Sequence, residues 1–290
     1  MTFRDAARAC GDGSADSGTP SADLRESVGR LARTVQVRVS YVLASGSISI
    51  RLWKGVGMSA RHIEELGGVP VDELAPYLTA RSGLPGPRSN LQLADAFASI
   101  ADRSTILRFA DLEDEYLRFC GTEAIGRLIL EQPDNDSLCA LLRRRATDDL
   151  WRVREGAARA LQIVGDADRA RLRAMVADWV GDANPYVRRA AVAAICEPRL
   201  LTDPATKTAA LRACFRASES ITMLPASERK VPGVRNLRQA LGYCWSVAVA
   251  ADPDSAMPAF ERLKEADDPD IRWIVASNLK KSRLRRHLAS

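Results

Sequence analysis

The arginines are the main candidates for ligand binding in this sequence. Lysine and arginine together number 42 against 37 aspartates and glutamates, which leaves a formal net charge of +5. A guanidinium group binds phosphate or carboxylate through paired hydrogen bonds. Arginines in register along one surface would therefore hold a nucleic-acid backbone with little sequence preference, or would hold an acidic protein segment. The arginines that could do so lie in the C-terminal half: Arg152, Arg154, Arg159, Arg188, Arg189, Arg235, Arg238 and Arg272.

Tryptophans and a basic run in the same half could serve the same ligand. The near-regular spacing of Trp151, Trp179, Trp245 and Trp273 favours packing between repeats, but an exposed indole would instead stack on a base or hold a cation. The run KKSRLRRH, residues 280–287, would bind phosphate or would complement the dipole at the end of the last helix. The residues predicted to bind are Arg152, Arg159, Arg189, Arg238, Trp151, Trp245, Lys280, Lys281 and Arg283.

No motif for metal or cofactor chemistry accompanies these residues. The six cysteines form no CxxC pair, and the two histidines, His62 and His287, leave little from which to build a zinc site. The sequence also lacks a glycine-rich phosphate loop, a nucleophile elbow and an HExxH motif. We therefore expect no metal and no cofactor, and we expect most of the cysteines to be small buried hydrophobes on helices.

A repeated helix start positions the arginines. An apolar-arginine dipeptide recurs at 153–154, 187–188, 234–235 and 271–272, at intervals that bracket the roughly 40 residues of a two-helix repeat. Pro185, Pro232 and Pro269 each stand two residues before it, and Trp151 takes the place of proline in the first repeat. Proline is favoured in the first turn of a helix, where its missing N–H has no partner to lose. The pattern Pro-x-(Val/Ile)-Arg therefore predicts the start of the second helix in each repeat.

A first helix precedes each of these second helices. The expected first helices are 137–146, 167–180, 204–217 and 255–266, and short acidic turns link them to the second helices. One helix pair cannot bury its apolar face alone, so the sequence predicts an all-α fold, an α-solenoid of stacked antiparallel pairs. In this register we expect the dipeptide arginines to reach turn aspartates (Asp148, Asp149, Asp182 and Asp267) and the other arginines to be more exposed.

The segments DDLWRVREGAARALQIVGD, DANPYVRRAAVAAICEPRLL and DDPDIRWIVASNLKK make the chain resemble the HEAT-repeat superfamily over Leu91–Leu288. The string RQALGYCWSVAVAADP is also similar to one in a group of bacterial HEAT-repeat proteins. This resemblance implies antiparallel helix pairs whose second helices line a concave, arginine-bearing surface.

A narrower similarity concerns the HEAT-like alkylpurine DNA glycosylases. Those enzymes carry a tryptophan, an acid one turn later, an arginine in the next repeat and a further tryptophan, all lining one groove. Trp151 and Glu155 resemble the first two of these residues. Arg189 resembles the arginine, and Trp245 resembles the further tryptophan. The resemblance implies that Trp151, Glu155 and Arg189 would be catalytic, with aromatic contact to a cationic base and a carboxylate that steadies the charge developing as the glycosidic bond breaks. The acid here is Glu rather than Asp, which moves the carboxylate by one methylene.

The N-terminal region is less clearly patterned. Residues 1–22 are predicted to be a disordered tail, residues 23–89 an N-terminal helical module or cap, and residues 90–290 the repeat array, with the loop at 82–90 as the boundary. The stretch Val35–Trp53 alternates apolar and polar residues as a β-hairpin would, but it could also form two short helices, which we prefer because every later element is helical.

These features favour a non-enzymatic binding protein whose partner is nucleic acid or, failing that, an acidic protein segment. The alternatives are a glycosylase-like DNA repair enzyme and a scaffold for protein–protein interaction. No window approaches the ~20 apolar residues of a membrane span, and the first residues lack the apolar core of a secretory signal, so we expect a cytoplasmic protein with no membrane partner.

Overall fold

The computed structural model describes residues 38–44, 47–53 and 60–288. The chain divides into two compact units, Met1–Lys54 and Gly55–Ser290, and each is described by itself. The predicted tail at residues 1–22 lies outside the described residues. The predicted boundary at residues 82–90 stays a prediction.

The first unit contains a β-hairpin. Strands β1 (Arg38–Ala44) and β2 (Ser47–Trp53) pair antiparallel, with Arg38 opposite Trp53 and Ala44 opposite Ser47. The preference for helices in this stretch was therefore wrong. The alternation of apolar and polar residues has the period of a strand, and its valines and isoleucines favour extended backbone, so the local pattern was a better guide than the helical character of the rest of the chain.

The second unit is helical throughout its described residues, apart from turns and loops. Five helices come first: α3 (Ala60–Gly67), α4 (Leu74–Ala80), α5 (Leu91–Ile100), α6 (Arg103–Ala110) and α7 (Glu115–Glu131). The helix pairs follow: α8 (Asp136–Arg145) with α9 (Trp151–Ala167), α10 (Arg169–Trp179) with α11 (Pro185–Ile195), α12 (Pro204–Thr222) with α13 (Pro232–Ala251), and α14 (Pro253–Lys264) with α15 (Pro269–Leu279). A last short helix, α16 (Ser282–Leu288), ends the described chain, and two 3₁₀ turns lie at Pro198–Leu200 and Glu228–Lys230.

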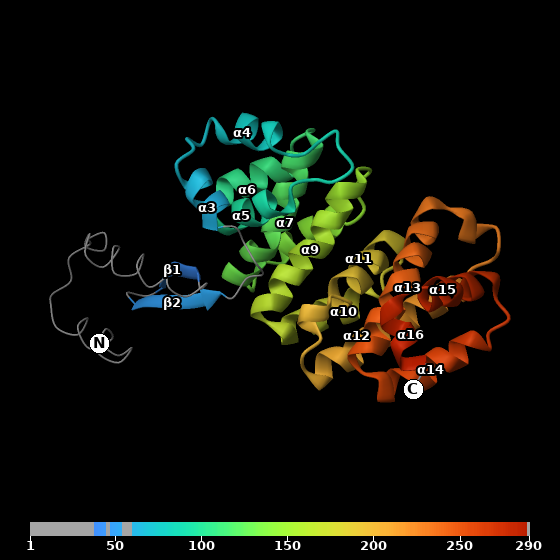
Figure 1. Ribbon diagram of the computed structural model, residues 1–290. Coiled ribbons are helices and arrows are strands. Elements are labelled where there is room, and N and C mark those ends of the chain that lie inside the picture. The colour runs from blue at the N-terminus through green and yellow to red at the C-terminus, as the bar shows by residue number, and fades with distance from the viewer. Residues whose placement is uncertain (1–37, 45–46, 54–59, 289–290) are drawn as a thin grey trace. The chain divides into compact units, whose positions relative to one another are not determined.

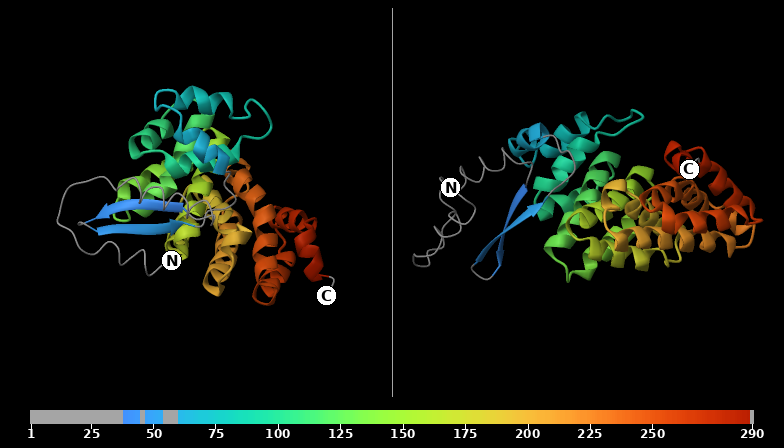
Figure 2. Two further views of the ribbon diagram at one scale, coloured as in Figure 1. Left: turned by 60° about the vertical axis from the view of Figure 1, so that its left-hand side comes forward. Right: turned by 60° about the horizontal axis from the view of Figure 1, so that its bottom comes forward.

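The second helices form one continuous row. Helices α7, α9, α11, α13 and α15 each pack directly on the next, and Figures 1 and 2 show the pairs following one another along the unit. This arrangement confirms the predicted all-α stack of helix pairs for the second unit. The predicted register is confirmed as well, because Trp151, Pro185, Pro232 and Pro269 are the first residues of the four second helices.

Caps and arginines satisfy the backbone at these helix starts. Asn184 accepts a hydrogen bond from the backbone N–H of Tyr186, and Asp268 accepts from those of Asp270 and Ile271. The start of α9 has neither a proline nor a side-chain cap on Leu150. Arg154 instead donates to the carbonyl of Asp149 at 2.8 Å and to that of Asp148, so a guanidinium holds the turn in the repeat that lacks proline.

Small residues at the helix crossings allow the backbones of neighbouring helices in this row to approach closely. A Cβ on Gly126 of α7 would lie 2.3 Å from the carbonyl oxygen of Ala160 on α9. Neither backbone can move without shifting the core between the helices, in which Ile125, Leu128 and Leu161 are fully buried.

Gly126→Ala is therefore expected to destabilise the protein by roughly 1–3 kcal/mol, although alanine is the better helix former. Chemical denaturation measures the change. The matched control is Gly67→Ala in α3, where an added Cβ meets no atom within 4 Å and the expected effect is near zero or slightly stabilising. Equal stability changes for the two variants would show that the α7–α9 crossing is not close-packed.

Candidate ligand-binding surface

Arginine–carboxylate pairs cross the junctions between successive helix pairs. Arg152 on α9 lies 3.3 Å from Glu115 on α7, and Arg238 on α13 lies 2.5 Å from Asp270 on α15. Other pairs also link groups about one repeat apart in the sequence: Arg118–Asp148, Arg143–Asp182, Arg145–Asp111, Arg159–Glu123, Arg199–Asp166 and Arg229–Asp268. We call this set the junction pairs.

The junction pairs reverse the expected exposure of three arginines. Arg152, Arg159 and Arg238 were expected to be exposed, but they lie between helices, where a cation needs a carboxylate partner; Arg152 is only 8% exposed. The dipeptide arginines were expected to reach turn aspartates. Arg272 does so and pairs with the exposed Asp267 at 2.5 Å, whereas Arg154 binds the backbone carbonyls of Asp148 and Asp149 rather than their carboxylates.

The most deeply buried junction pair contains a second carboxylate. Arg159 donates to both oxygens of Glu123, at 3.0 and 3.1 Å, and to Asp95 on α5 at 2.6 Å. Glu123 is fully buried, whereas the side chain of Asp95 keeps 28% of its exposure. Burial raises the pKa of Glu123 to about 8, and Arg159 opposes this rise only in part. One guanidinium is shared between the two carboxylates, so Arg159 offsets the burial of Glu123 only in part.

A row of aromatic rings, each in contact with a cation, follows the second helices. The guanidinium of Arg152 lies 4.3 Å from the ring centre of Trp151, that of Arg154 4.6 Å from Tyr186, and that of Arg238 4.8 Å from Trp273. Tyr243 on α13 has Arg283 at 4.5 Å and Lys281 at 5.8 Å. Trp151 is 50% exposed, Tyr243 41% and Trp273 39%. We call these four rings with their cations the cation–aromatic row.

Two members of this row were not singled out from the sequence. Tyr186 directly follows Pro185 of the Pro-x-(Val/Ile)-Arg pattern, and this position at a helix start could have identified it as a candidate. Tyr243 has no such signal, because its cations come from the turn after α15 and from α16, which only folding brings to it.

The three residues that resemble a glycosylase site lie on neighbouring second helices. Glu155 follows Trp151 by one turn on α9, and Arg189 on α11 donates to the carbonyl of Arg154 at 3.3 Å. Burial lowers the pKa of Arg189, and Glu155 opposes this shift, so the two side chains interact electrostatically.

Trp245 cannot line a surface, and its predicted exposure was wrong. Its side chain is fully buried, its indole N–H donates to the hydroxyl of Ser218 at 3.0 Å, and its ring packs on Phe260. It therefore joins α13 to α12 and α14 as a core residue, which is the packing role that the regular spacing of the tryptophans favoured.

Cations without a carboxylate partner gather at the C-terminal end of the row. Within the described part of the chain, Lys280, Lys281, Arg283, Arg285 and Arg286 take part in no salt bridge. Lys280, Arg285 and Arg286 are exposed, and Lys281 and Arg283 contact Tyr243. We call these five residues the C-terminal cations.

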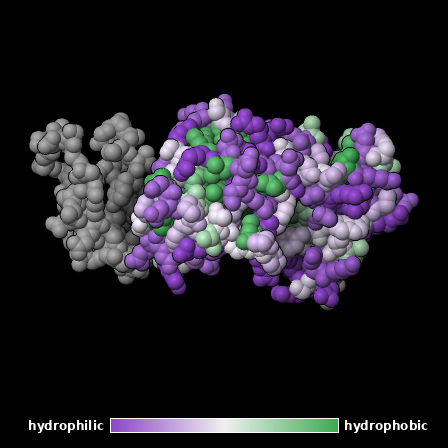
Figure 3. Space-filling view, turned by 90° about the horizontal axis from the view of Figure 1, so that it is seen from above, coloured by the Kyte–Doolittle hydropathy of each residue, from purple (hydrophilic) through white to green (hydrophobic). Residues whose placement is uncertain are grey.

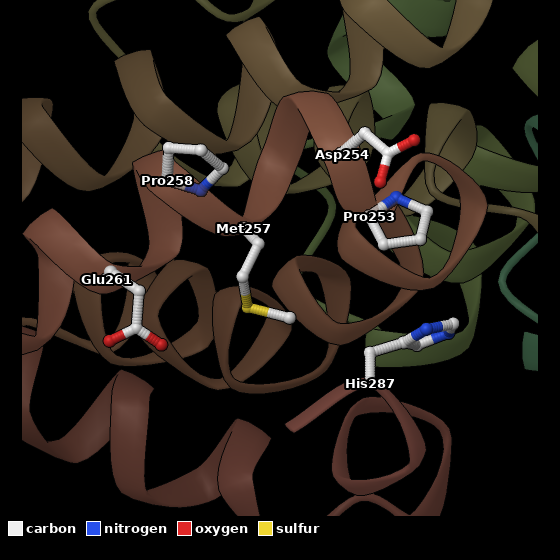
Figure 4. A pocket seen from close by; sticks show the side chains of 6 residues that line it. All are labelled: Pro253, Asp254, Met257, Pro258, Glu261 and His287. Atoms are coloured by element: carbon white, nitrogen blue, oxygen red, sulfur yellow. The ribbon is translucent and has the colours of Figure 1, made fainter. Parts of the chain in front are cut away.

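A shallow pocket lies between α14 and α16 (Figure 4). It is lined by Pro253, Asp254, Met257, Pro258, Glu261 and His287, of which only His287 belongs to a segment singled out from the sequence. Over residues 38–44, 47–53 and 60–288, no group of three histidine, cysteine or carboxylate side chains could hold a metal ion. No helix in the described ranges is long and apolar enough to cross a membrane.

No family model and no curated protein matches this chain. Solved structures with a similar arrangement include a designed armadillo repeat protein, 16% identical over 77% of this chain and 98% of that one, with a TM-score of 0.36. A second designed armadillo repeat protein, solved in complex with the peptide (KR)4, is 16% identical over 77% of this chain and 98% of that one, with a TM-score of 0.34. An engineered protein is 15% identical over 80% of this chain and all of its own, with a TM-score of 0.36.

At these scores the likeness carries no argument about function. The second unit is a helical repeat structure by its own contacts, and the similarity to HEAT-repeat proteins stays a prediction.

The buried Glu123 predicts how stability depends on pH. Because the folded state raises its pKa from 4.5 to about 8, the native protein binds this proton more tightly than the unfolded chain. Its contribution is present below pH 4.5 and is lost as the pH rises through about 8, by roughly 2–5 kcal/mol in the free energy of unfolding.

Urea denaturation from pH 5 to 9 should therefore show a decline that Glu123→Gln reduces. The exposed Glu113→Gln is the matched control and should keep the slope of the original protein. A Glu123→Gln variant with an unchanged slope would mean that Glu123 is ionised in the folded state throughout this range.

Proposed function

We propose that this chain is a binding scaffold whose second helices hold an extended polyanion, and that the ligand is single-stranded nucleic acid. The observation that carries the proposal is the cation–aromatic row together with the C-terminal cations. Half-exposed rings provide faces on which bases can stack, and the C-terminal cations can hold phosphates that connect those bases.

The junction pairs support this location. A guanidinium that already pairs with a carboxylate between helices has little capacity left for phosphate, so the arginines of the junction pairs are poor candidates to bind a ligand. The C-terminal cations have no such partner within the described residues, and two of them lie against Tyr243. The arginine stripe expected from the sequence is thereby reduced to a shorter region around α13, α15 and α16.

The face of the second unit seen in Figure 3 is largely hydrophilic. In the face seen in Figure 3, hydrophobic residues form separate patches among hydrophilic ones and do not join into one apolar groove. An amphipathic helix of a protein partner would need a continuous apolar groove. A flexible polyanion needs only spaced rings and cations.

Binding to a labelled single-stranded oligonucleotide, measured by fluorescence anisotropy at several salt concentrations, tests the proposal. Lys281→Ala/Arg283→Ala is expected to weaken binding about 10-fold or more and to lower the salt slope by about 1–2. The matched control is Arg212→Ala/Arg216→Ala on α12, which removes two exposed cations from a first helix and should change affinity less than about 2-fold.

If both double variants weaken oligonucleotide binding equally, the loss reflects the net charge of the protein rather than a specific surface, and the proposal is wrong. An acidic peptide that competes as well as the oligonucleotide, mole for mole, would assign the surface to an acidic protein segment instead.

A glycosylase activity is the second candidate, favoured by the placement of Trp151, Glu155 and Arg189 on α9 and α11. It lacks the further tryptophan, because Trp245 is buried. Incubation with an alkylated duplex should release free base, and Glu155→Gln should slow release about 100-fold or more if the carboxylate stabilises developing charge. Binding of the duplex without base release would eliminate this candidate.

A further inference from the structure

Three cysteine thiols meet in one buried site that the proposed function does not use. Cys196 ends α11, Cys214 lies within α12 and Cys244 within α13. The sulfur atoms of Cys196 and Cys214 are 3.5 Å apart. Cys244 contacts the carbonyl of Val192 at 3.5 Å, and its thiol also interacts with that of Cys196. We call these three residues the thiol cluster.

The thiol cluster is not a general consequence of burying cysteines. Cys120 on α7 is also fully buried, but its thiol interacts with the hydroxyl of Tyr116 rather than with another sulfur. The members of the cluster come from three different helices, are 0–3% exposed, and are all free thiols. A buried pair of free thiols in contact is a pair of reduced groups held at the distance from which a disulfide can close.

We infer that Cys196 and Cys214 are a redox site in which a small peroxide forms a reversible disulfide. One thiolate attacks a peroxide oxygen, the O–O bond breaks, and hydroxide leaves to give a sulfenic acid. The second thiol then attacks that sulfur, the S–O bond breaks, and water leaves. Overall, two thiols lose two electrons and two protons, and hydrogen peroxide takes them up to become two waters.

The contact between Cys196 and Cys214, whose sulfur atoms are 3.5 Å apart, selects this pair. A disulfide needs its sulfurs at about 2.05 Å, so the two must approach by about 1.5 Å through rotation of the side chains and a small backbone shift. Cys196 is the residue that caps α11 and is followed by Glu197 and the turn at Pro198–Leu200, so its backbone is outside the rigid part of the helix.

The burial of the site selects the oxidant. With all three thiols 0–3% exposed, a bulky disulfide reagent cannot reach them without opening the helix stack, whereas hydrogen peroxide is hardly larger than water. Contact with a neighbouring thiol, together with burial, raises the pKa of Cys196 and of Cys244. The contact with Cys196 lowers the pKa of Cys214, but burial raises it by more, so the reactive thiolate is scarce at all three. Oxidation is therefore expected to be slow and confined to conditions of sustained peroxide exposure.

The test is treatment of the reduced full-length protein with hydrogen peroxide, followed by blocking of free thiols, proteolysis without reductant, and mass spectrometry. The expected product is a peptide pair joined through Cys196 and Cys214, 2 Da lighter than the sum of the reduced peptides, which dithiothreitol separates again. The melting temperature should rise on oxidation and return on reduction, because the cross-link restricts the unfolded chain.

Single-cysteine variants distinguish this pair from the other buried cysteines. Cys244→Ala and Cys120→Ala should each still form the cross-link, whereas Cys214→Ala should abolish it and the reversible shift in melting temperature. The cross-link found in the peptides of the wild-type protein tests the inference even if a variant fails to fold. Cross-links through Cys244, cross-links only between chains, or a cross-link that forms only after denaturation would each overturn the inference.

Discussion

Each helix pair of the second unit is tied to the next by a guanidinium that crosses the junction to a carboxylate. The positions fit because a two-helix repeat brings residues one repeat apart in the sequence to neighbouring heights in the stack. Arg152–Glu115, Arg159–Glu123 and Arg238–Asp270 lie along the second helices, where apolar contact from alanine, valine and leucine supplies most of the burial. Each ion pair at the surface stabilises the fold little. A buried charged group without its partner would destabilise it strongly, so the buried pairs favour the one register of stacking in which every such group is paired.

This constraint also decides what remains for a ligand. An arginine between helices cannot leave its carboxylate without exposing a buried charge, and the aromatic rings that its guanidinium covers keep only one face for other contacts. The C-terminal cations differ because no carboxylate among the described residues pairs with them. They are therefore available to bind a polyanion.

The helix-pair architecture could be predicted because it depends on local patterns. Pro185, Pro232 and Pro269 mark helix starts by backbone chemistry alone, and Trp151 was correctly placed at the first residue of α9. The partners of Arg152 and Arg238 could not be predicted, because the choice between phosphate and carboxylate depends on burial, and burial depends on how neighbouring helices cross. The same holds for Trp245, whose spacing matched a groove residue while its position on α13 faces the core. Helices were wrongly preferred for Val35–Trp53, because the helical character of the rest of the chain was given more weight than the two-residue period of this stretch.

The most direct test of the proposed surface is photo-cross-linking of the full-length protein to a single-stranded oligonucleotide, with the attached peptides identified by mass spectrometry. Adducts are expected at Tyr243 and Trp273, with Trp151 as a further site, and none on the first helices α10 and α12. Adducts spread evenly over first and second helices, or found only at the first helices, would show that the second helices do not form the binding surface.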